Sequence, residues 1–446
     1  MKLYEEKKQR LSSELLNRAE ANEKIVLNKD TSNLFRARQK GINENKIDVK
    51  SFNNVIDVDS ANLIAEVEGM TSYADLVEET LKSSCLPAVV PELKSITIGG
   101  AISGCGIESS SFRYGLVHET VQEMDVLLGD GRVLTCTPYN EYKDLFFAIP
   151  NTFGTLGYIL KVKVKLIPIK KAVKITHKRF FDPQDFFDAI RSICQENRVD
   201  YVEGVIFDHN EMYVTTGEFI EEAPFVSDYK YRKIYYRSIQ KVQIDYLTVS
   251  DYIWRWDTDW FWCSKVFGMQ NPVLRLLLGK CMLGSSTYTK MMHFANRNPV
   301  ITSAWNAFGS KKESVIQDAV IPIQEAARFY DFFRKEVGIK PIWICPYKSY
   351  SQETRYAFCP MDTKALYVDF GFWDRVETNG NDGFINRKIE DKVRELGGFK
   401  SLYSDSYYTE KEFWEMYDRK RYEELKAKYD PKGRLKGFYE KCVRNQ

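Results

Sequence analysis

The sequence predicts an α+β protein of two domains, and three observations support this prediction. A chain of 446 residues exceeds the roughly 250 to 300 residues that one hydrophobic core usually serves. Short β-prone runs joined by turns fill residues 1–170, and a new pattern of strand, helix and antiparallel strands begins near residue 174. We therefore expect a first domain over 1–170, a second domain over 171–405 with an antiparallel sheet, and a closing segment, 406–446, that returns to the first domain.

The elements of the first domain follow from local patterns. In order, we expect a charged helix over 1 to about 25, strands over 24–27, 55–58 and 63–67, a helix from 73 to 81, a hairpin with strands over 123–128 and 132–136, and a strand over 158–168. Thr71 or Ser72 can cap the second helix, because either side chain can accept a hydrogen bond from a free backbone N–H. Gly129-Asp130-Gly131 is a typical hairpin turn.

The second domain begins with a strand at Lys174. A helix around Asp185–Cys194 follows, and then two strands over Tyr201–Phe207 and Glu211–Thr216. The closing segment, Glu410–Phe438, has a helical pattern.

Composition excludes several classes of function. The 64 basic and 62 acidic residues leave a net charge of +2, which argues against a nucleic-acid surface. Nine cysteines without CxxC or metal-ligand spacing indicate free thiols in a reducing compartment and no metal site. No signal peptide or run of about 18 apolar residues is present, so we expect a cytoplasmic protein. The apolar run Pro272–Leu283, with Arg275 and Lys280, is either a membrane-surface segment or a buried helix.

The segment Pro91–Gly115 carries most of the chemical information. We expect a short strand over Ser95–Ile98, and glycines and small hydroxyl residues follow it at close spacing. In such a segment several backbone N–H groups can converge on a pyrophosphate, although an ordinary Gly/Ser turn has the same composition. Cys105 lies within it and is interpreted as a small packing residue.

Four stretches in the same order resemble one family. They are VPELKSITIGGAISGCGIESSSFRYGL from Val90, FGTLGYIL from Phe153, PIWICP from Pro341 and LYSDSYYTEKEFWEMYD from Leu402. They are similar to delta24-sterol reductases and their bacterial relatives, some of which act on methylene fatty-acyl lipids, within the vanillyl-alcohol-oxidase (PCMH-type) flavoproteins. The resemblance implies a two-lobed FAD-binding domain over 1–170 and an α+β substrate domain with an antiparallel sheet.

The resemblance also implies where FAD is held. Only some fifty residues precede Val55, so the first lobe is shortened, and Ser32, Asn33 and Arg36 stand where the family has its first glycine-rich loop. None of the four histidines lies in that early segment, which implies noncovalent FAD. The residues assigned to the cofactor are Arg36, Ile98, Gly99, Gly100, Ser103, Gly104, Gly106, Ile107, Glu108, Ser109, Ser110, Tyr114, Gly115, Gly154, Thr155, Gly157 and Ile159.

By the same resemblance, the activity is reduction of an isolated C=C bond in a lipid, either a sterol or isoprenoid side chain or a methylene fatty-acyl chain. NADPH or NADH would be the electron donor and would visit the same pocket, since the chain has no GxGxxG motif of its own. A sugar or alcohol oxidase of the same superfamily and a noncatalytic flavin- or lipid-binding protein are the alternatives. A homo-oligomer and peripheral contact with a membrane are compatible with each of them.

An isolated alkene has no carbonyl to accept hydride, so its reduction needs a proton donor and a surface that stabilises a carbocation. Aromatic faces attract cations, and four tryptophans crowd one short stretch: Trp254, Trp256, Trp260 and Trp262. The alternative for these rings is core or dimer packing. For the proton donor we expect Tyr407 with Asp405 or Glu412 behind it, and Glu108 is the competing candidate.

Overall fold

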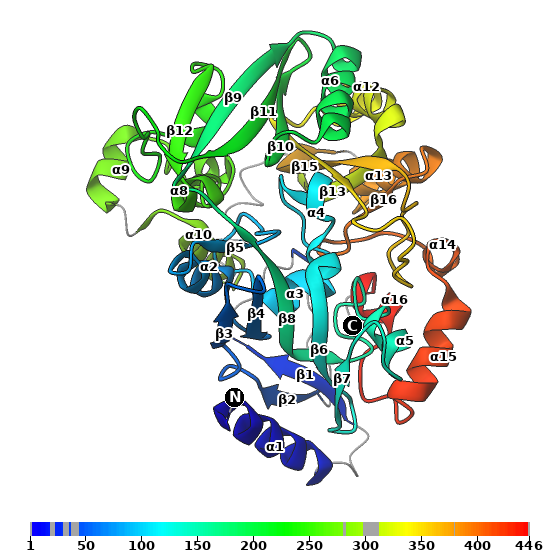
Figure 1. Ribbon diagram of the computed structural model, residues 1–446. Coiled ribbons are helices and arrows are strands. Elements are labelled where there is room, and N and C mark those ends of the chain that lie inside the picture. The colour runs from blue at the N-terminus through cyan, green and yellow to red at the C-terminus, as the bar shows by residue number, and fades with distance from the viewer. Residues whose placement is uncertain are drawn as a thin grey trace.

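The computed structural model describes residues 2–17, 23–29, 35–36, 44–279, 282–297, 312–378 and 380–444. Their strands form a small parallel pair, a six-stranded antiparallel sheet and an eight-stranded antiparallel sheet. In Figure 1 the six-stranded sheet occupies the lower half of the molecule and the eight-stranded sheet the upper half. The predicted α+β class with an antiparallel second domain is confirmed.

The six-stranded sheet belongs to the first part of the chain. Its strands are β3 (Val55–Asp59), β4 (Ile64–Glu68), β8 (Tyr158–Pro168), β6 (Val121–Leu127), β7 (Val133–Cys136) and β5 (Cys85–Pro87), which pairs with β8. The short helices beside it are α2 (Tyr73–Leu81), α3 (Ile98–Ser103), α4 (Ser111–Tyr114), η1 (Val117–Thr120) and α5 (Lys143–Phe146). Ser72 caps α2, because its hydroxyl accepts the N–H of Asp75. The predicted hairpin and α2 are therefore confirmed.

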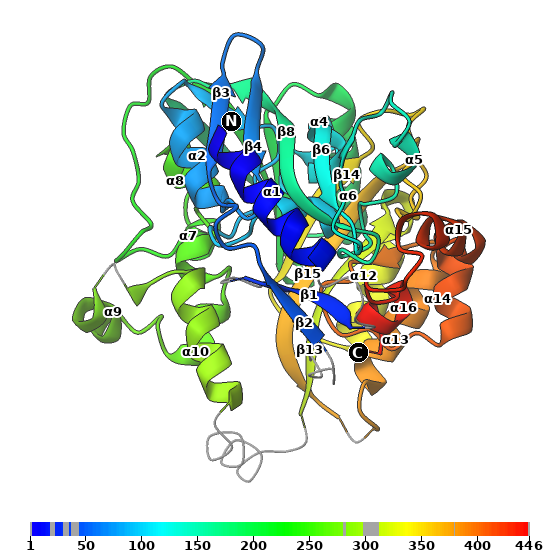
Figure 2. The same cartoon turned by 90° about the horizontal axis from the view of Figure 1, so that it is seen from below.

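A small N-terminal layer packs against this sheet. It consists of α1 (Lys2–Asn17) and the parallel strands β1 (Lys24–Asn28) and β2 (Glu44–Asp48), which Figure 2 shows side by side. Leu11 and Leu15 of α1 share a hydrophobic core with Ile25, Ile47 and Tyr158. Apolar contact thus holds the N-terminal layer on the sheet.

The eight-stranded sheet is built from the rest of the chain. In spatial order its strands are β12 (Ile244–Thr248), β9 (Ala172–Phe180), β11 (Glu211–Ile220), β10 (Tyr201–Asp208), β14 (Ile342–Lys348), β15 (Leu366–Glu377), β13 (Lys312–Pro322) and β16 (Phe399–Lys400). Helices α6 (Pro183–Glu196), α12 (Ala326–Glu336) and α13 (Phe384–Glu395) cover one face, and η5 (Ile323–Glu325) leads into α12. Between β11 and β13 lie α7 (Tyr235–Ser238), α8 (Val249–Ile253), η2 (Asp257–Asp259), η3 (Cys263–Phe267), α9 (Pro272–Leu278) and α10 (Ser285–Arg297).

The two faces of this sheet have different neighbours, because side chains alternate along each strand. On β15, Val368 and Phe370 point into the core beneath α12 and α13. Their neighbour Tyr367 points the other way and packs with Val320 of β13 near Cys105 of the first domain. The second face of the sheet therefore turns toward the first domain, and we call it the inner face.

The closing segment contacts both parts of the molecule. It contains α14 (Glu410–Met416), α15 (Arg419–Tyr429) and α16 (Phe438–Cys442), so the predicted helix is interrupted. Asp418 starts a new helix by accepting the N–H of Arg421. Lys428 and Tyr429 of α15 bond to Asp144 of the first domain.

One local prediction is wrong. Ser95–Ile98 is not a strand, because the hydroxyl of Thr97 accepts the N–H of Gly100 and α3 begins at Ile98. Among the described residues, no helix has the length and apolar character needed to cross a membrane.

Candidate active site

The glycines of the loop after α2 serve chain packing. The N–H of Gly99 bonds to the carbonyl of Gly69, and a Cβ on Gly99 would lie 2.7 Å from that oxygen. The N–H of Gly106 bonds to Ala101, and a Cβ there would meet Val117, Pro91 and Ala101 side chains at 3.1 to 3.3 Å. The expectation that Gly106 leaves room for phosphate is not supported, because the space is filled by protein. Gly100 is exposed in the first turn of α3.

Arg36 has the properties of an anion-binding residue. Its side chain is buried, Nη1 donates to the carbonyl of Leu402 at 2.9 Å, and the guanidinium lies 4.7 Å from the centroid of Phe153. Its Nη2 has no hydrogen-bond partner among the described residues. A buried cationic N–H without an acceptor is costly unless a ligand completes it. Ser32 and Asn33 lie outside the described residues.

Phe153 joins Arg36 to the glycine loop. Its N–H donates to the carbonyl of Ser103, and its ring would be 3.3 Å from a Cβ on Gly104. The side chain of Arg36 therefore lies over an aromatic ring that touches the end of α3. These residues form a basic, glycine-lined surface that suits the pyrophosphate of a dinucleotide.

The second glycine motif, at Gly154 and Gly157, packs the first domain next to this surface. Gly154 has a φ of +81°, and a Cβ on Gly157 would collide with Val126. Thr155 is buried, with its carbonyl accepting the ammonium of Lys426. The carbonyl of Ile159 lies against Gly69. These predicted cofactor residues hold the first domain together next to Phe153.

The segment from Ile107 to Gly115 lies between the two domains. Ile107 packs toward the inner face of the large sheet. The hydroxyl of Ser110 donates to Ala88, a lysine ammonium lies 5.6 Å from the ring centroid of Tyr114, and Gly115 adopts a φ of +74° beside Glu119. Ser109 donates to Glu108.

Glu108 belongs to a buried ion-pair network. The guanidinium of Arg255 lies 3.0 Å from Glu108 and 2.9 Å from Glu203, and all three side chains are at most 1% exposed. The indole N–H groups of Trp256 and Trp343 both donate to Glu203. Because Glu108 of the first domain is ion-paired to Arg255, this contact joins the two domains.

The four predicted pocket tryptophans have different surroundings. Trp254 is half-buried under Lys94, and Trp256 is buried in the Glu203 network. Trp260 stacks on Tyr288 and lies 5.6 Å from Phe35 between ring centroids. Trp262 lies 5.4 Å from Trp373 on β15. Trp256 and Trp262 are thus both core residues, each 1% exposed and 6.3 Å apart between ring centroids, and Trp262 extends this aromatic core to the inner face.

The nearby aspartates are structural as well. Asp259 pairs with Arg275 at 2.6 Å, and Asp257 accepts the N–H of Lys94 and the hydroxyl of Ser285. Neither pairs with Arg255, which turns to the two glutamates instead.

Two aspartates on the inner face were missed by the sequence reasoning. In the antiparallel register of β13 and β15, Asp369 faces Val320 and Asp318 faces Gly371. The two aspartates therefore project from neighbouring strands on one face, as diagonal neighbours. Asp369 is 1% exposed, and neither of its carboxyl oxygens has a hydrogen-bond partner among the described residues. Asp318 is partly exposed and accepts a hydrogen bond from the hydroxyl of Tyr403 at 3.2 Å.

The environment of this carboxyl pair favours its protonated form. Burial raises the pKa of Asp318 to about 7, although Tyr403 and Lys400 oppose the shift. Burial and then the charge of Asp318 raise the pKa of Asp369 well above its usual range. Two carboxyl groups that share one site cannot both ionise easily, so the pair holds a proton near neutral pH.

Aromatic side chains adjoin the pair. Trp373 donates its indole N–H to the hydroxyl of Tyr403, whose ring lies 5.9 Å from Phe35 between centroids. Phe35 precedes Arg36, and its N–H bonds to the carbonyl of Tyr403. These rings form an aromatic surface that connects the basic surface at Arg36 with the carboxyl pair.

The predicted proton donors of the closing segment lie elsewhere. Tyr407 packs against Gly383, just before α13, and its N–H bonds to Glu390 of that helix. Since α13 covers the opposite face of the sheet, Tyr407 is separated from the inner face. Burial raises the pKa of its hydroxyl further.

Asp405 and Glu412 have structural contacts too. The carbonyl of Asp405 accepts a hydrogen bond from Lys400. Glu412 caps α14 with Thr409 and pairs with Arg387, and its hydrogen bond to Arg387 holds its pKa below the usual range. An ionised carboxylate in an ion pair is a poor acid, so the contacts do not support the predicted role of Glu412.

A comparison with protein families agrees with this geometry. Residues 13–137 match the family model described as FAD binding domain. The match includes Arg36 and the whole loop from Gly99 to Gly115. Together with the antiparallel domain that faces it, the match defines an FAD-dependent oxidoreductase of the PCMH type, and the predicted FAD cofactor agrees with it.

Along most of its length the chain is similar to Delta(24)-sterol reductases. The protein from Pisum sativum is 29% identical over 445 residues, which cover 90% of this chain and 76% of the relative. The protein from Homo sapiens is 28% identical over 413 residues, or 88% of this chain and 76% of the relative. Cytokinin dehydrogenase 3 from Arabidopsis thaliana is 31% identical over 156 residues, only 34% of this chain. The chain is a distant homologue of the Delta(24)-sterol reductases.

Proposed function

We propose that the protein reduces an isolated C=C bond in a lipid, with NADPH or NADH as electron donor. The observation that carries the proposal is the pair Asp318 and Asp369 on neighbouring strands of the inner face, where burial raises the pKa of both carboxyl groups beside an aromatic surface. Asp369 is the proton donor in this proposal, and Asp318 and Tyr403 position it. This assignment replaces Tyr407, Asp405 and Glu412.

Different residues bind the cofactor, donate the proton and stabilise the cation in the proposed reaction. Arg36 and the end of α3 would hold the pyrophosphate of FAD, which would supply hydride when bound. The acid delivers its proton to the less substituted alkene carbon, so that positive charge develops on the more substituted one. Trp373, Tyr403 and Phe35 present aromatic rings near the acid, and such faces stabilise a cation by about 1 to 2 kcal/mol when water is excluded.

A sugar or alcohol oxidase would need a different group at this place. Such an enzyme removes a proton from its substrate, and the base must be ionised before it reacts. A carboxyl pair with raised pKa values favours donation instead. A purely binding protein would leave unexplained why two acids with no counterion of their own lie on the inner face.

We also propose that the lipid comes from a membrane that α9 contacts. Val273, Leu276 and Leu277 of this helix are 61 to 75% exposed, and Arg275 between them turns inward to Asp259. Arg275 of α9 donates a hydrogen bond to the carbonyl of Tyr231, so the next two residues, Arg232 and Lys233, lie beside this helix. Both are exposed. An apolar helix with basic neighbours suits an anionic lipid surface.

The experiment that tests the function measures the flavin in two half-reactions. NADPH or NADH is added without air, and the loss of absorbance of the oxidised flavin is recorded. Sterols with a side-chain alkene and phospholipids with a methylene or unsaturated acyl chain are then offered separately, and the return of absorbance identifies the substrate class. Loss of colour with neither nucleotide, or its return only with oxygen, would contradict the proposed reductase.

Deuterated water tests the origin of the proton. We expect label on one former alkene carbon, the less substituted one, because the acid exchanges its proton with solvent. Product without solvent label would rule out a protein acid.

A further inference from the structure

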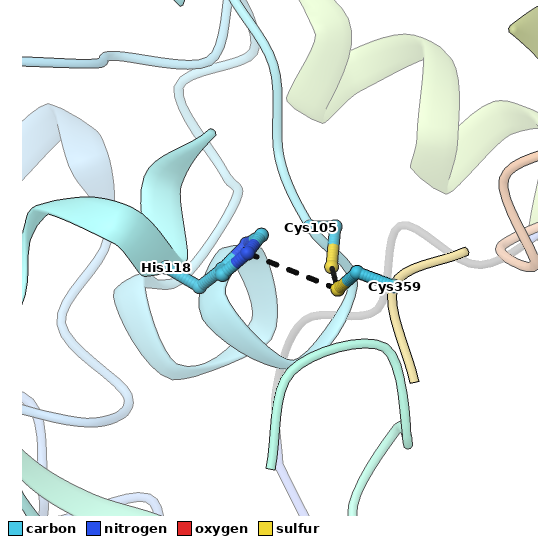
Figure 3. A group of neighbouring side chains, drawn as sticks. All are labelled: Cys105, His118 and Cys359. Atoms are coloured by element: carbon cyan, nitrogen blue, oxygen red, sulfur yellow. Dashed lines mark hydrogen bonds between the residues drawn. The ribbon is translucent and has the colours of Figure 1, made fainter. Parts of the chain in front are cut away.

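Three potential metal ligands meet at the boundary between the glycine loop and the inner face. Cys105 follows α3, His118 lies in η1, and Cys359 lies in the connection between β14 and β15 (Figure 3). Their ligand atoms all lie within 4.8 Å of one another. Cys105 and Cys359 are 254 residues apart in the sequence, so no spacing motif indicates the group.

Two of the three separations are close to those around a tetrahedral metal ion. The two Sγ atoms are 3.5 Å apart, and the Sγ of Cys359 is 3.8 Å from Nε2 of His118. Zinc lies about 2.3 Å from thiolate sulfur and about 2.0 to 2.1 Å from imidazole nitrogen, so tetrahedral angles place these ligand atoms about 3.5 to 3.8 Å apart. The side chains therefore need little movement to share one ion.

The ligands are held in place before any ion binds. His118 is 1% exposed, and the ring of Tyr356 lies 4.3 Å from it in a T-shaped contact. The segment that carries Cys359 is fixed by two hydrogen bonds to the first domain: Asn151 donates to Phe358, and Ala357 donates to Phe147.

The backbone of Cys105 has an unusual conformation. It adopts a φ of +55°, which L residues with a side chain seldom take. Backbone strain of this kind persists where the surroundings enforce it and is common at functional sites.

The imidazole distinguishes a metal site from a disulfide. Nε2 of His118 faces the thiol of Cys359, and Nδ1 has no hydrogen-bond partner among the described residues. If the two sulfurs were joined, Nε2 would lose the thiol that faces it and the buried ring would have no polar partner. In a metal site the same nitrogen is a ligand.

We propose that Cys105, His118 and Cys359 bind one thiophilic divalent cation, with Zn²⁺ as the expected ion. Binding removes one proton from each thiol, and the two protons go to solvent. Three protein ligands leave a fourth position for water. The ion would tie the glycine loop to the β14–β15 connection, next to the side chains that Cys105 contacts on the inner face.

Cobalt provides a direct test in the FAD-containing protein. The reduced protein is freed of metal with a chelator and titrated with Co²⁺, whose tetrahedral thiolate complexes absorb at longer wavelengths than oxidised flavin. We expect these bands to saturate at one equivalent and to disappear when Zn²⁺ is added. Metal analysis of the protein loaded with Zn²⁺ should give the same stoichiometry.

Cysteine variants test whether Cys105 and Cys359 are the metal ligands. Cys105→Ser and Cys359→Ser should each weaken Co²⁺ binding at least tenfold and lose the thiolate bands. Cys85→Ser is the matched control, because the thiol of Cys85 is also buried and donates to Ser83, a bond that serine can replace. Flavin absorbance and circular dichroism report whether each variant is folded.

Two results would overturn the proposal. One is a wild-type protein that shows no tetrahedral Co²⁺ spectrum while its thiols are reduced. The other is a spectrum that persists in Cys105→Ser and Cys359→Ser. A peptide that links Cys105 to Cys359 in protein prepared with reductant would assign the pair to a disulfide instead.

Discussion

The hydroxyl of Tyr403 donates a hydrogen bond to Asp318 and accepts one from the indole of Trp373. A residue that follows β16 thereby joins β13 to β15 on the inner face. Because the ring of Tyr403 also makes a T-shaped contact with Phe35, Tyr403 is the point at which the aromatic surface meets the carboxyl pair. The predictions about catalysis follow from this junction.

Asp369→Asn should slow reduction of the lipid while leaving FAD bound. The amide keeps the shape of the side chain but cannot donate a carboxylic proton, and general acid catalysis contributes about 10²- to 10⁴-fold. The measurement is single-turnover return of flavin absorbance after lipid is added to the reduced enzyme. The rate of flavin reduction by NADPH or NADH should stay within a factor of about three, because that step needs no protein group to donate a proton to carbon.

The matched controls for this variant are Asp374→Asn and Tyr407→Phe. Asp374 lies farther along β15 and pairs with Lys265 near the surface, and Tyr407 lies beside α13. Both variants should keep nearly the wild-type rate. If Tyr407→Phe lowered the rate tenfold and Asp369→Asn did not, the acid would belong to the closing segment.

The rate of the lipid half-reaction should fall as pH rises. Burial raises the pKa of Asp318 to about 7, and burial followed by the charge of Asp318 raises the pKa of Asp369. Below these values the pair is protonated and can donate, and above them the donor is lost, so the rate should drop about tenfold per pH unit. Single-turnover rates between about pH 5 and about pH 9 give the profile.

Asp318→Asn distinguishes the contributions of the two carboxyl groups to the pH profile. Removing the charge of Asp318 lowers the pKa of Asp369, so the falling limb of the pH profile should move to lower pH. A profile that stays in place would show that a group outside the pair controls the reaction.

Arg36→Met should weaken FAD binding by roughly 10- to 100-fold, the range expected when a charged hydrogen bond of about 1.5 to 3 kcal/mol is lost. The reason is the buried Nη2 of Arg36, which has no partner among the described residues. Release of flavin on dilution, followed by its fluorescence, measures the affinity. Arg132→Met is the control, since that arginine is exposed and pairs with Asp130 in the hairpin.

Much of the fold could be predicted because its signals are local. Strand alternation, the Ser72 cap and the Gly-Asp-Gly turn each act within a few residues of sequence. The β-branched residues Ile96, Thr97 and Ile98 favour a strand, but the hydroxyl of Thr97 caps α3 and so determines a helix instead.

The site was harder to predict because strand pairing assembles it. Asp318 and Asp369 meet only through the register of β13 and β15, which no local pattern reveals. A signal was present, however, since Asp369 interrupts the apolar strand LYVDFGFW and a carboxyl group on such a strand needs a partner or a function. Glu108 and the glycines could be recognised by resemblance, but only the fold shows that they serve packing and an ion pair.

Arg255→Met should destabilise the protein by about 3 to 5 kcal/mol, because it leaves Glu108 and Glu203 buried without their cation. Urea unfolding monitored by tryptophan fluorescence gives the change in free energy. Adding Glu203→Gln to Arg255→Met should recover part of the loss by removing one of the two charges. Arg375→Met, at an exposed position of β15, should change stability by less than about 0.5 kcal/mol. Equal effects of both arginine variants would show that the network contributes little.

The proposed membrane contact through α9 can be tested by replacing Leu276 and Leu277 with aspartate. These side chains are 61% and 75% exposed at the edge of the molecule, where Figures 1 and 2 both place α9. Burying one leucine stabilises by about 1.5 to 3 kcal/mol, so losing two such contacts should weaken binding to anionic vesicles at least tenfold. Flotation with vesicles measures the bound fraction.

The matched control for the membrane test places the same two charges on α1. Leu3 and Leu16 are 59% and 53% exposed there, on a helix that lies apart from α9 in Figure 1. Leu3→Asp with Leu16→Asp should leave flotation unchanged, and turnover of a soluble, short-chain substrate should be unchanged in both double variants. Equal loss of flotation in the two would mean that added negative charge, rather than the apolar surface of α9, determines binding, because anionic lipids repel both.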